Sequence, residues 1–116
     1  MLSNLWKKTA KILNSFELPE HRFEYLGILK GVHFINDSKA TNVISTIKAL
    51  NTLIDHHENI VLIAGGIAKQ EDYTPLFDLI DKDVASVVLI GQSAQTLGAG
   101  IKKSTVSYAD SMDEAV

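Results

Sequence analysis

The sequence predicts a three-layer α/β domain with a mostly parallel sheet that is entered through an antiparallel hairpin. Two predominantly apolar runs, residues 60–64 and 85–90, are each followed by glycine. Apolar runs of this kind form the strands of parallel sheets that helices cover on both faces. Helical patterns alternate with these strands. Two extended runs joined by a lysine and a glycine precede them, which is typical of a hairpin.

Residues 1–16 open the chain with apolar residues at helical spacing, and not with the continuous apolar block of a signal peptide. An amphipathic helix is therefore expected there, and Pro19 ends its pattern. The extended runs 23–29 and 32–35 then form the hairpin. From Val43 onward the apolar residues fall on one helical face, so a helix is expected to lead from the hairpin to the first apolar strand.

The second half of the chain alternates between strands and helices. After the strand at 60–64, a helix is expected over 74–81, with Thr74 as its cap and Pro75 at the first helical position, where the missing N–H is harmless. The strand at 85–90 follows. The remaining expected elements are a helix over 94–97 capped by Ser93, a short strand over 104–106 and a helix that begins near residue 111.

Composition excludes several classes of protein. With 116 residues, 46% hydrophobic and 22% charged, the chain has the size and composition of one globular domain. Its longest uninterrupted apolar run is far shorter than the ~20 residues of a membrane-spanning helix, so no membrane insertion is expected. The net charge of -3 gives no reason to expect nucleic acid as a partner. The absence of cysteine excludes disulfides and thiolate metal sites and fits a cytoplasmic protein.

The first candidate site is the loop at 36–42, with the sequence Asn-Asp-Ser-Lys-Ala-Thr-Asn. It places Asp37, Lys39 and Thr41 just before the expected helix, whose free N–H groups and dipole favour an anion. The residue types alone leave a plainer alternative open. In that alternative, Thr41 or Asn42 caps the helix and the lysine is solvated.

The second candidate follows the strand at 60–64, where Gly65 and Gly66 precede Lys69. Paired glycines allow a sharp turn or a close approach to a ligand, and a lysine beyond them reaches an anion as a point charge. An ordinary strand-to-helix turn with a surface lysine explains the same residues equally well. Asp72 is interpreted as an acidic residue at a helix start.

The third candidate is Arg22, the only arginine of the chain, at the beginning of the first extended run. A guanidinium group suits the paired oxygens of a phosphate, although an isolated arginine on a strand is more often an edge or salt-bridge residue. Residues 100–105 lack the glycine before the lysine that a P-loop needs. No metal site is predicted.

Five segments, taken together, resemble the third domain of the Mur ligase family. Their order and spacing are those of the branch that adds D-glutamate to UDP-N-acetylmuramoyl-L-alanine. The string Asp-Ser-Lys-Ala-Thr-Asn at 37–42 is the most specific, because sister Mur ligases and folylpolyglutamate synthases differ there. The segments are residues 18–24, 31–32, 36–42, 65–69 and 72–76.

The resemblance implies a Rossmann-like domain of an ADP-forming, ATP- and Mg²⁺-dependent ligase of peptidoglycan precursor synthesis. In such an enzyme ATP phosphorylates the muramoyl-alanine carboxylate, and the amine of D-glutamate attacks the acyl phosphate. By similarity, Thr41 and Lys69 hold the α-carboxylate of D-glutamate, and Lys39 acts as a catalytic residue near the acceptor or the phosphoryl group. Arg22 contacts the phosphate of ATP and Asp37 its ribose.

The sequence also departs from the family. Nothing in it resembles the central ATPase domain or the domain that binds the uridine nucleotide, and the family's closing serine loop is missing. Residues 1–116 are therefore expected to be an incomplete carboxyl-terminal domain, inactive and without a cofactor of its own. Two alternatives remain, a free-standing α/β module that binds a small anion through Thr41 and Lys69, and the same domain of a sister Mur or folylpolyglutamate ligase. The interpretation requires the turns at 37–42 and 65–69 to converge at one rim of the sheet.

Overall fold

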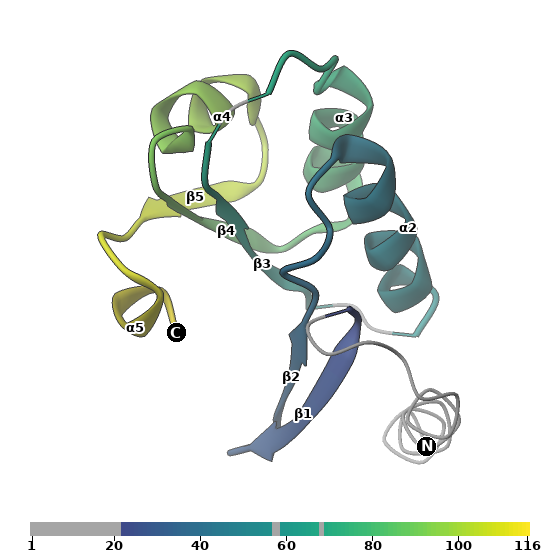
Figure 1. Cartoon of the computed structure of the whole chain (residues 1–116). Helices are drawn as coiled ribbons and strands as arrows, with labels where there is room; N and C mark the ends of the chain where they lie inside the picture. The colour runs from purple at the N-terminus through teal and green to yellow at the C-terminus, as the bar shows by residue number, and fades with distance from the viewer. Residues whose placement is uncertain (1–21, 57–58, 68) are drawn as a thin grey trace. The chain divides into compact units, whose positions relative to one another are not determined.

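The computed structural model describes residues 22–56, 59–67 and 69–116. The helix predicted for residues 1–16, and Pro19 after it, lie outside the described residues. The predicted α/β class is confirmed, with an antiparallel hairpin, a parallel sheet and helices between the strands (Figure 1). No helix in the described part of the chain has both the length and the apolar character that crossing a membrane requires.

The first of two compact units comprises Met1–His56. Within it, β1 (Glu24–Leu29) pairs antiparallel with β2 (Val32–Asn36) in a two-stranded sheet of its own. Lys30 and Gly31 make the turn with φ angles of 51° and 82°. Positive φ at both central residues gives a two-residue turn the twist that matches its strands, which is why the Lys-Gly pair produced the predicted hairpin.

Helix α2 (Val43–Ile54) follows the hairpin in the same unit, as predicted. Asn42 caps it, since its side-chain oxygen accepts the backbone N–H of Ser45 at 2.8 Å. Val43 and Leu50 lie two turns apart on one face and are buried, with exposed fractions of 7% and 2%. These two side chains show which face of α2 is buried and which faces remain accessible.

The second unit, His57–Val116, is built on a parallel sheet. Its strands β3 (Val61–Gly65), β4 (Ser86–Ile90) and β5 (Thr105–Tyr108) lie in the order β3-β4-β5. Each connection therefore moves one strand along the sheet in the same direction. Right-handed crossovers in one direction place the connecting helices on the same face.

Helices α3 (Thr74–Asp83) and α4 (Ala94–Gly100) are these connections, and α5 (Met112–Ala115) follows β5. A Cβ atom at Gly100 would collide with the ring of Phe77, so α3 and α4 touch where the glycine leaves room. Figure 1 shows α3 and α4 on one side of the sheet and α5 on the other. The last helix contains only four residues.

Burial in the sheet differs between its two faces. Val87 and Leu89, on one face of β4, are each 1% exposed, whereas Val88 on the other face is only half-buried. Val61 of β3 is 59% exposed. The expectation that both apolar strands are buried on both faces is thus wrong for one face.

One of the two predicted helix caps is wrong, and the other holds its position without the expected side-chain bond. Thr74 is the first residue of α3 and Tyr73 holds the cap position, because Asp72 accepts the backbone N–H of Thr74 at 3.0 Å and begins the helix from outside. Ser93 does occupy the cap position of α4, but its side chain makes no capping bond. Its backbone N–H instead donates to the carbonyl of Gly66 at 2.9 Å, which ties the two strand ends together.

Candidate functional site

The loop between β2 and α2 is folded by its own polar groups. The side-chain oxygen of Asn36 accepts the N–H of Ser38 at 3.1 Å, and the carbonyl of Asp37 accepts the N–H of Ala40 at 2.8 Å. Short polar side chains that bind nearby backbone groups favour turns over helix or strand. Asn42 then caps α2, so the plainer sequence interpretation is confirmed in part, because the loop does end in a helix cap.

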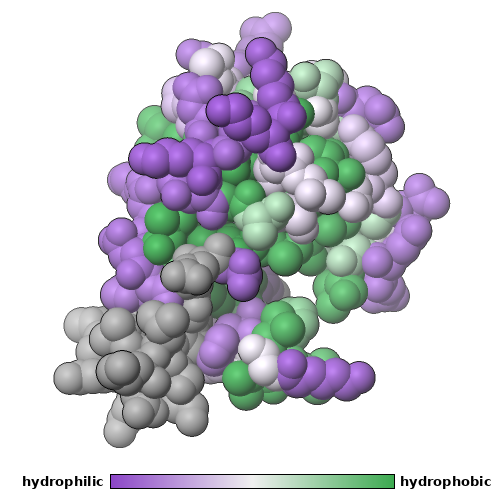
Figure 2. Space-filling view, turned by 180° about the vertical axis from the view of Figure 1, so that it is seen from behind, coloured by the Kyte–Doolittle hydropathy of each residue, from purple (hydrophilic) through white to green (hydrophobic). Residues whose placement is uncertain are grey.

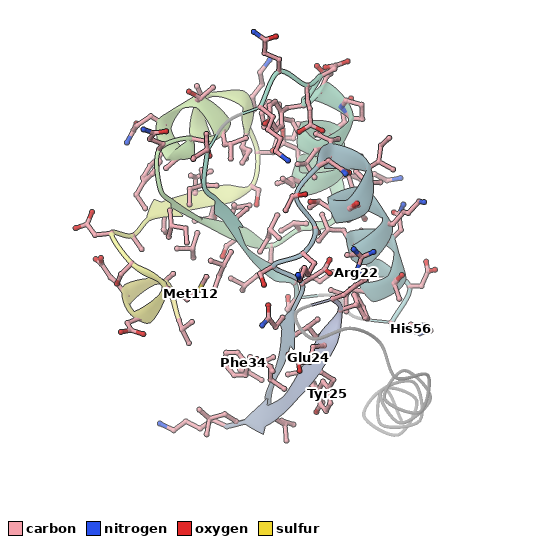
Figure 3. All side chains as sticks on the ribbon, in the orientation of Figure 1. Arg22, Glu24, Tyr25, Phe34, His56 and Met112 are labelled. Carbon is pink, nitrogen blue, oxygen red and sulfur yellow. The ribbon has the colours of Figure 1, made fainter. Side chains whose placement is uncertain are left out.

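Asp37 also connects the loop to the residue after Arg22. Its Oδ1 atom accepts the backbone N–H of Phe23 at 2.9 Å. Phe23 has a φ of 46°, which a side chain larger than glycine seldom adopts. This hydrogen bond across 14 residues holds the start of the hairpin against the loop. Figure 3 shows the Arg22 side chain beside α2 at the base of the hairpin.

A pocket of about 340 Å³ lies where these segments meet. Arg22, Asp37 and Lys39 all line it, so three residues chosen from the sequence share one pocket within the first unit. Thr41 is exposed and is not among the described residues that line the pocket. The described lining residues are Arg22, Phe23, Asp37, Lys39, Ala40, Ser45, Lys48, Ala49 and Thr52.

One wall of the pocket was missed by the sequence analysis. Ser45, Lys48, Ala49 and Thr52 come from α2 at the spacing i, i+3, i+4 and i+7, which places them on one helical face. The sequence does contain polar and small residues at helical spacing on this face of α2. Nothing local indicated that this face would lie beside the loop, because the rotation of α2 depends on the core.

The charges of the pocket favour an anion. Its described lining contains the cations Arg22, Lys39 and Lys48 and a single carboxylate, Asp37. None of the three cations forms an ion pair with another residue that the structure describes. A guanidinium and ammonium groups gathered around one carboxylate produce a net positive potential, which attracts phosphate or carboxylate ligands.

The glycine turn after β3 belongs to the second unit. Gly65 and Gly66 have φ angles of 150° and 109°. A Cβ atom at Gly65 would collide with the carbonyl of Ile90, while a Cβ at Gly66 would meet no atom within 4 Å. The first glycine is therefore needed because the backbone of β4 comes close. The second provides the turn and leaves open space beside it.

Lys69 is anchored through its backbone. Its N–H donates to the hydroxyl of Tyr73 at 3.1 Å, and that hydroxyl donates to the Lys69 carbonyl at 3.3 Å. The Tyr73 ring in turn stacks on Phe77 of α3, with ring centroids 6.0 Å apart. The exposed Lys69 side chain thus extends from a fixed backbone position. No sequence pattern indicated this role of Tyr73.

Asp72 behaves as the helix-start acid that the sequence predicted. The backbone N–H and the hydroxyl of Thr74 lower the pKa of its carboxyl below the ordinary value. Elsewhere in the described residues, no group of three or more histidine, aspartate or glutamate side chains is arranged to hold a metal ion. Thr41 and Lys69 lie in different units, so their convergence stays a prediction.

Comparisons with known proteins identify the family of this chain. Residues 21–116 match the family described as the glutamate ligase domain of Mur ligases. The UDP-N-acetylmuramoylalanine--D-glutamate ligase of Koribacter versatilis is 41% identical over 110 residues, which cover 95% of this chain and 24% of the relative. The ligase of the same name from Elusimicrobium minutum is 46% identical over 95 residues, covering 82% of this chain and 20% of the relative.

A third relative of that name, from Chlorobium limicola, is 41% identical over 107 residues, or 91% of this chain and 22% of the relative. The chain therefore spans about a quarter of the length of the curated relatives it matches.

Proposed function

The chain belongs to the Mur ligase family through its glutamate ligase domain, and we propose that it is the D-glutamate-binding part of an ATP-dependent ligase. The parent enzyme would add D-glutamate to UDP-N-acetylmuramoyl-L-alanine in peptidoglycan precursor synthesis. The relatives named for this reaction support the proposal. So does the one pocket that Arg22, Asp37 and Lys39 share, which is the observation that carries it.

In the proposed reaction a carboxylate oxygen of UDP-N-acetylmuramoyl-L-alanine attacks the γ-phosphorus of ATP. The bond from that phosphorus to the bridging oxygen breaks, and ADP leaves. The amine of D-glutamate then attacks the carbonyl carbon of the acyl phosphate and loses a proton. The tetrahedral intermediate expels inorganic phosphate and the amide remains. Catalysis of this kind depends on positioning and on stabilising charge, and the residues of this chain would supply both.

The pocket in the first unit would serve the nucleotide. Arg22 offers a planar pair of donors to phosphate oxygens. Asp37 would accept a ribose hydroxyl, and a carboxylate has enough acceptor positions to do so while it holds the N–H of Phe23. Lys39, on the same pocket, would neutralise charge on the transferred phosphoryl group or the acceptor. Mg²⁺ would supply further charge neutralisation from ligands outside the described residues of this chain.

The D-glutamate site would combine Thr41 with Lys69. Thr41 directly precedes Asn42, the cap of α2, so it lies beside the first free N–H groups of that helix. A carboxylate is favoured at such a position. Lys69, held by Tyr73, would provide the matching positive charge. This pairing requires the loop of the first unit and the glycine turn of the second to meet when D-glutamate binds.

The isolated chain is proposed to have no ligase activity. Its sequence contains no P-loop and no segment that resembles the uridine-nucleotide domain of the family. Incubation with ATP, Mg²⁺, D-glutamate and UDP-N-acetylmuramoyl-L-alanine is therefore expected to release no phosphate. Turnover by the chain alone would contradict this part of the proposal.

A titration of the isotope-labelled chain with D-glutamate tests the site directly. We expect roughly millimolar binding, with NMR shifts centred on Thr41 and Lys69 and weaker effects from L-glutamate. Thr41→Ala and Lys69→Ala should each abolish the shifts, whereas Lys82→Ala, which removes an exposed charge from α3, should leave them unchanged. Shifts that survive both site variants would refute the assignment. Tight binding of another small anion around Gly66 would favour a free-standing binding module.

A further inference from the structure

We propose that Lys48 is a third anion-binding residue of the pocket in the first unit, and that this pocket holds a chain of phosphates, with Lys48 contacting one of them. The inference rests on the proposed function, in which that chain is the triphosphate of ATP. It concerns a residue of α2 that no sequence motif singled out. In Figure 3 the labelled Arg22, whose side chain lies beside α2, marks the region of this pocket.

The rotation of α2 determines the position of Lys48. Val43 and Leu50 are buried two turns apart and fix the core side of the helix. Ser45, Lys48 and Thr52 then fall on the roughly opposite face, and all three line the pocket. A lysine on a freely solvated face would have no such neighbours. Here the stem of Lys48 begins at the pocket wall.

Small residues keep the space in front of Lys48 open. Ala40 of the loop and Ala49 of the helix both line the pocket and carry only a methyl group. The resulting volume of about 340 Å³ lies at the small end of the range of roughly 300–1,000 Å³ typical of small-molecule sites. It therefore suits part of a nucleotide, such as its phosphates, better than a whole one.

Three cations from three different segments surround this space. Arg22 precedes the hairpin, Lys39 is in the loop and Lys48 is on the helix. They face one carboxylate, Asp37, which already accepts the N–H of Phe23. Like charges brought together repel each other, so a ligand with several negative charges relieves more repulsion than one with a single charge. The geometry thus favours a polyphosphate over inorganic phosphate.

The test is a calorimetric titration of the full chain with tripolyphosphate, ATP and inorganic phosphate at low salt. We expect tripolyphosphate and ATP to bind more tightly than inorganic phosphate. Lys48→Ala should weaken tripolyphosphate binding by roughly fivefold, the value of one exposed charge pair. Lys48→Arg should keep most of the affinity. Raising the salt concentration should reduce the difference between the wild type and Lys48→Ala, since exposed charges are screened.

Lys30→Ala is the matched control, because it removes the same charge from the exposed hairpin turn, which does not line the pocket. The affinity of this variant for tripolyphosphate should stay within about twofold of the wild type, because a distant charge is largely screened. Alanine is the better helix former, so Lys48→Ala should remain folded, as circular dichroism can verify.

Equal affinities of the Lys48→Ala and Lys30→Ala variants would overturn the inference, as would a wild type that binds tripolyphosphate no better than inorganic phosphate. The D-glutamate titration described above is an independent readout. If D-glutamate fails to bind while tripolyphosphate binds through Lys48, the proposed function fails and the polyphosphate pocket stands. The reverse result removes the role of Lys48 and leaves the proposed function in place.

Discussion

Asp81 shows how a single side chain organises a connection that the sequence patterns left undefined. It lies on α3, and its Oδ1 atom accepts the backbone N–H groups of Lys102, Lys103 and Ser104 at 3.1, 2.8 and 3.1 Å. These donors belong to the turn that leads from α4 into β5. Burial raises the pKa of Asp81, but these backbone N–H groups lower it by more, so it lies below the ordinary value of 3.8.

Replacing Asp81 with alanine should therefore destabilise the chain. The loss of three hydrogen bonds to a charged but largely accessible carboxylate is expected to cost about 1–2 kcal/mol in the free energy of unfolding at pH 7. Because the folded-state pKa is depressed, the contribution of Asp81 is complete above the unfolded-state pKa of about 4 and is lost as the pH falls through the lower folded-state value. Urea denaturation of the wild type and the variant at several pH values between roughly 2 and 7 measures this contribution.

The control is Asp78→Ala, on the same helix and exposed, for which the structure gives no comparable set of N–H donors among the described residues. It should change stability little at any pH. If the two variants lose the same stability, or if the Asp81→Ala deficit persists undiminished at low pH, the role assigned to the carboxylate is wrong.

At the level of whole elements, α2 forms one wall of the pocket in the first unit. Its amphipathic pattern was visible in the sequence, and the helix begins at Val43 as expected. The hairpin before α2 differs from a typical buried sheet in its exposed apolar residues. Leu26, Ile28 and Leu29 are each more than half exposed. Figure 2 shows hydrophobic side chains, in green, at the surface of this hairpin. Alternation along a strand predicts two faces, but not whether either one is covered.

The cap of α2 is predicted to be important for the stability of this unit. Asn42→Ala removes the acceptor for the N–H of Ser45 and should cost about 1 kcal/mol. Asn42→Asp keeps an acceptor and adds a negative charge at the positive end of the helix dipole, so it should retain the stability of the wild type. Thermal unfolding followed by circular dichroism distinguishes the variants. Equal melting temperatures for Asn42→Ala and wild type would show that water replaces the cap without cost.

For the molecule as a whole, the decisive question is whether the loop of the first unit and the glycine turn of the second meet. The two compact units carry different parts of the proposed D-glutamate site, Thr41 in one and Lys69 in the other. The proposed function requires both residues to reach the α-carboxylate of D-glutamate. Each unit therefore carries only part of the proposed site.

A paramagnetic label tests this convergence. The chain contains no cysteine, so Ser38→Cys in the exposed loop creates a single labelling site close to Thr41. With D-glutamate present, we expect the NMR signals of Gly66 and Lys69 to broaden more than those of Thr105, at the opposite end of the parallel sheet. The same label at Lys30 in the hairpin turn is the comparison. Equal broadening of Lys69 and Thr105 from position 38 would contradict a shared site.

Local chemistry allowed much of this protein to be predicted from its sequence. The Lys30-Gly31 pair determined the hairpin turn, since it accommodates two positive φ angles. Five short segments, of which residues 37–42 are the most specific, indicated the family, and the match over residues 21–116 confirms it. The prediction of Thr74 as a cap was wrong, because Thr74 is already the first residue of α3 and donates its own backbone N–H to Asp72.

The sequence by itself determined the order of the elements, their turns and the family, because neighbouring residues set these properties. Only the tertiary structure decided that Lys48 joins Arg22 and Lys39 around one pocket, that Gly65 is required by the carbonyl of Ile90, and which face of the parallel sheet is buried. Each of these depends on contacts between residues far apart in the chain. The rotation of α2 about its buried Leu50 is the example that matters most for function, since no local pattern specifies what lies opposite a helical face.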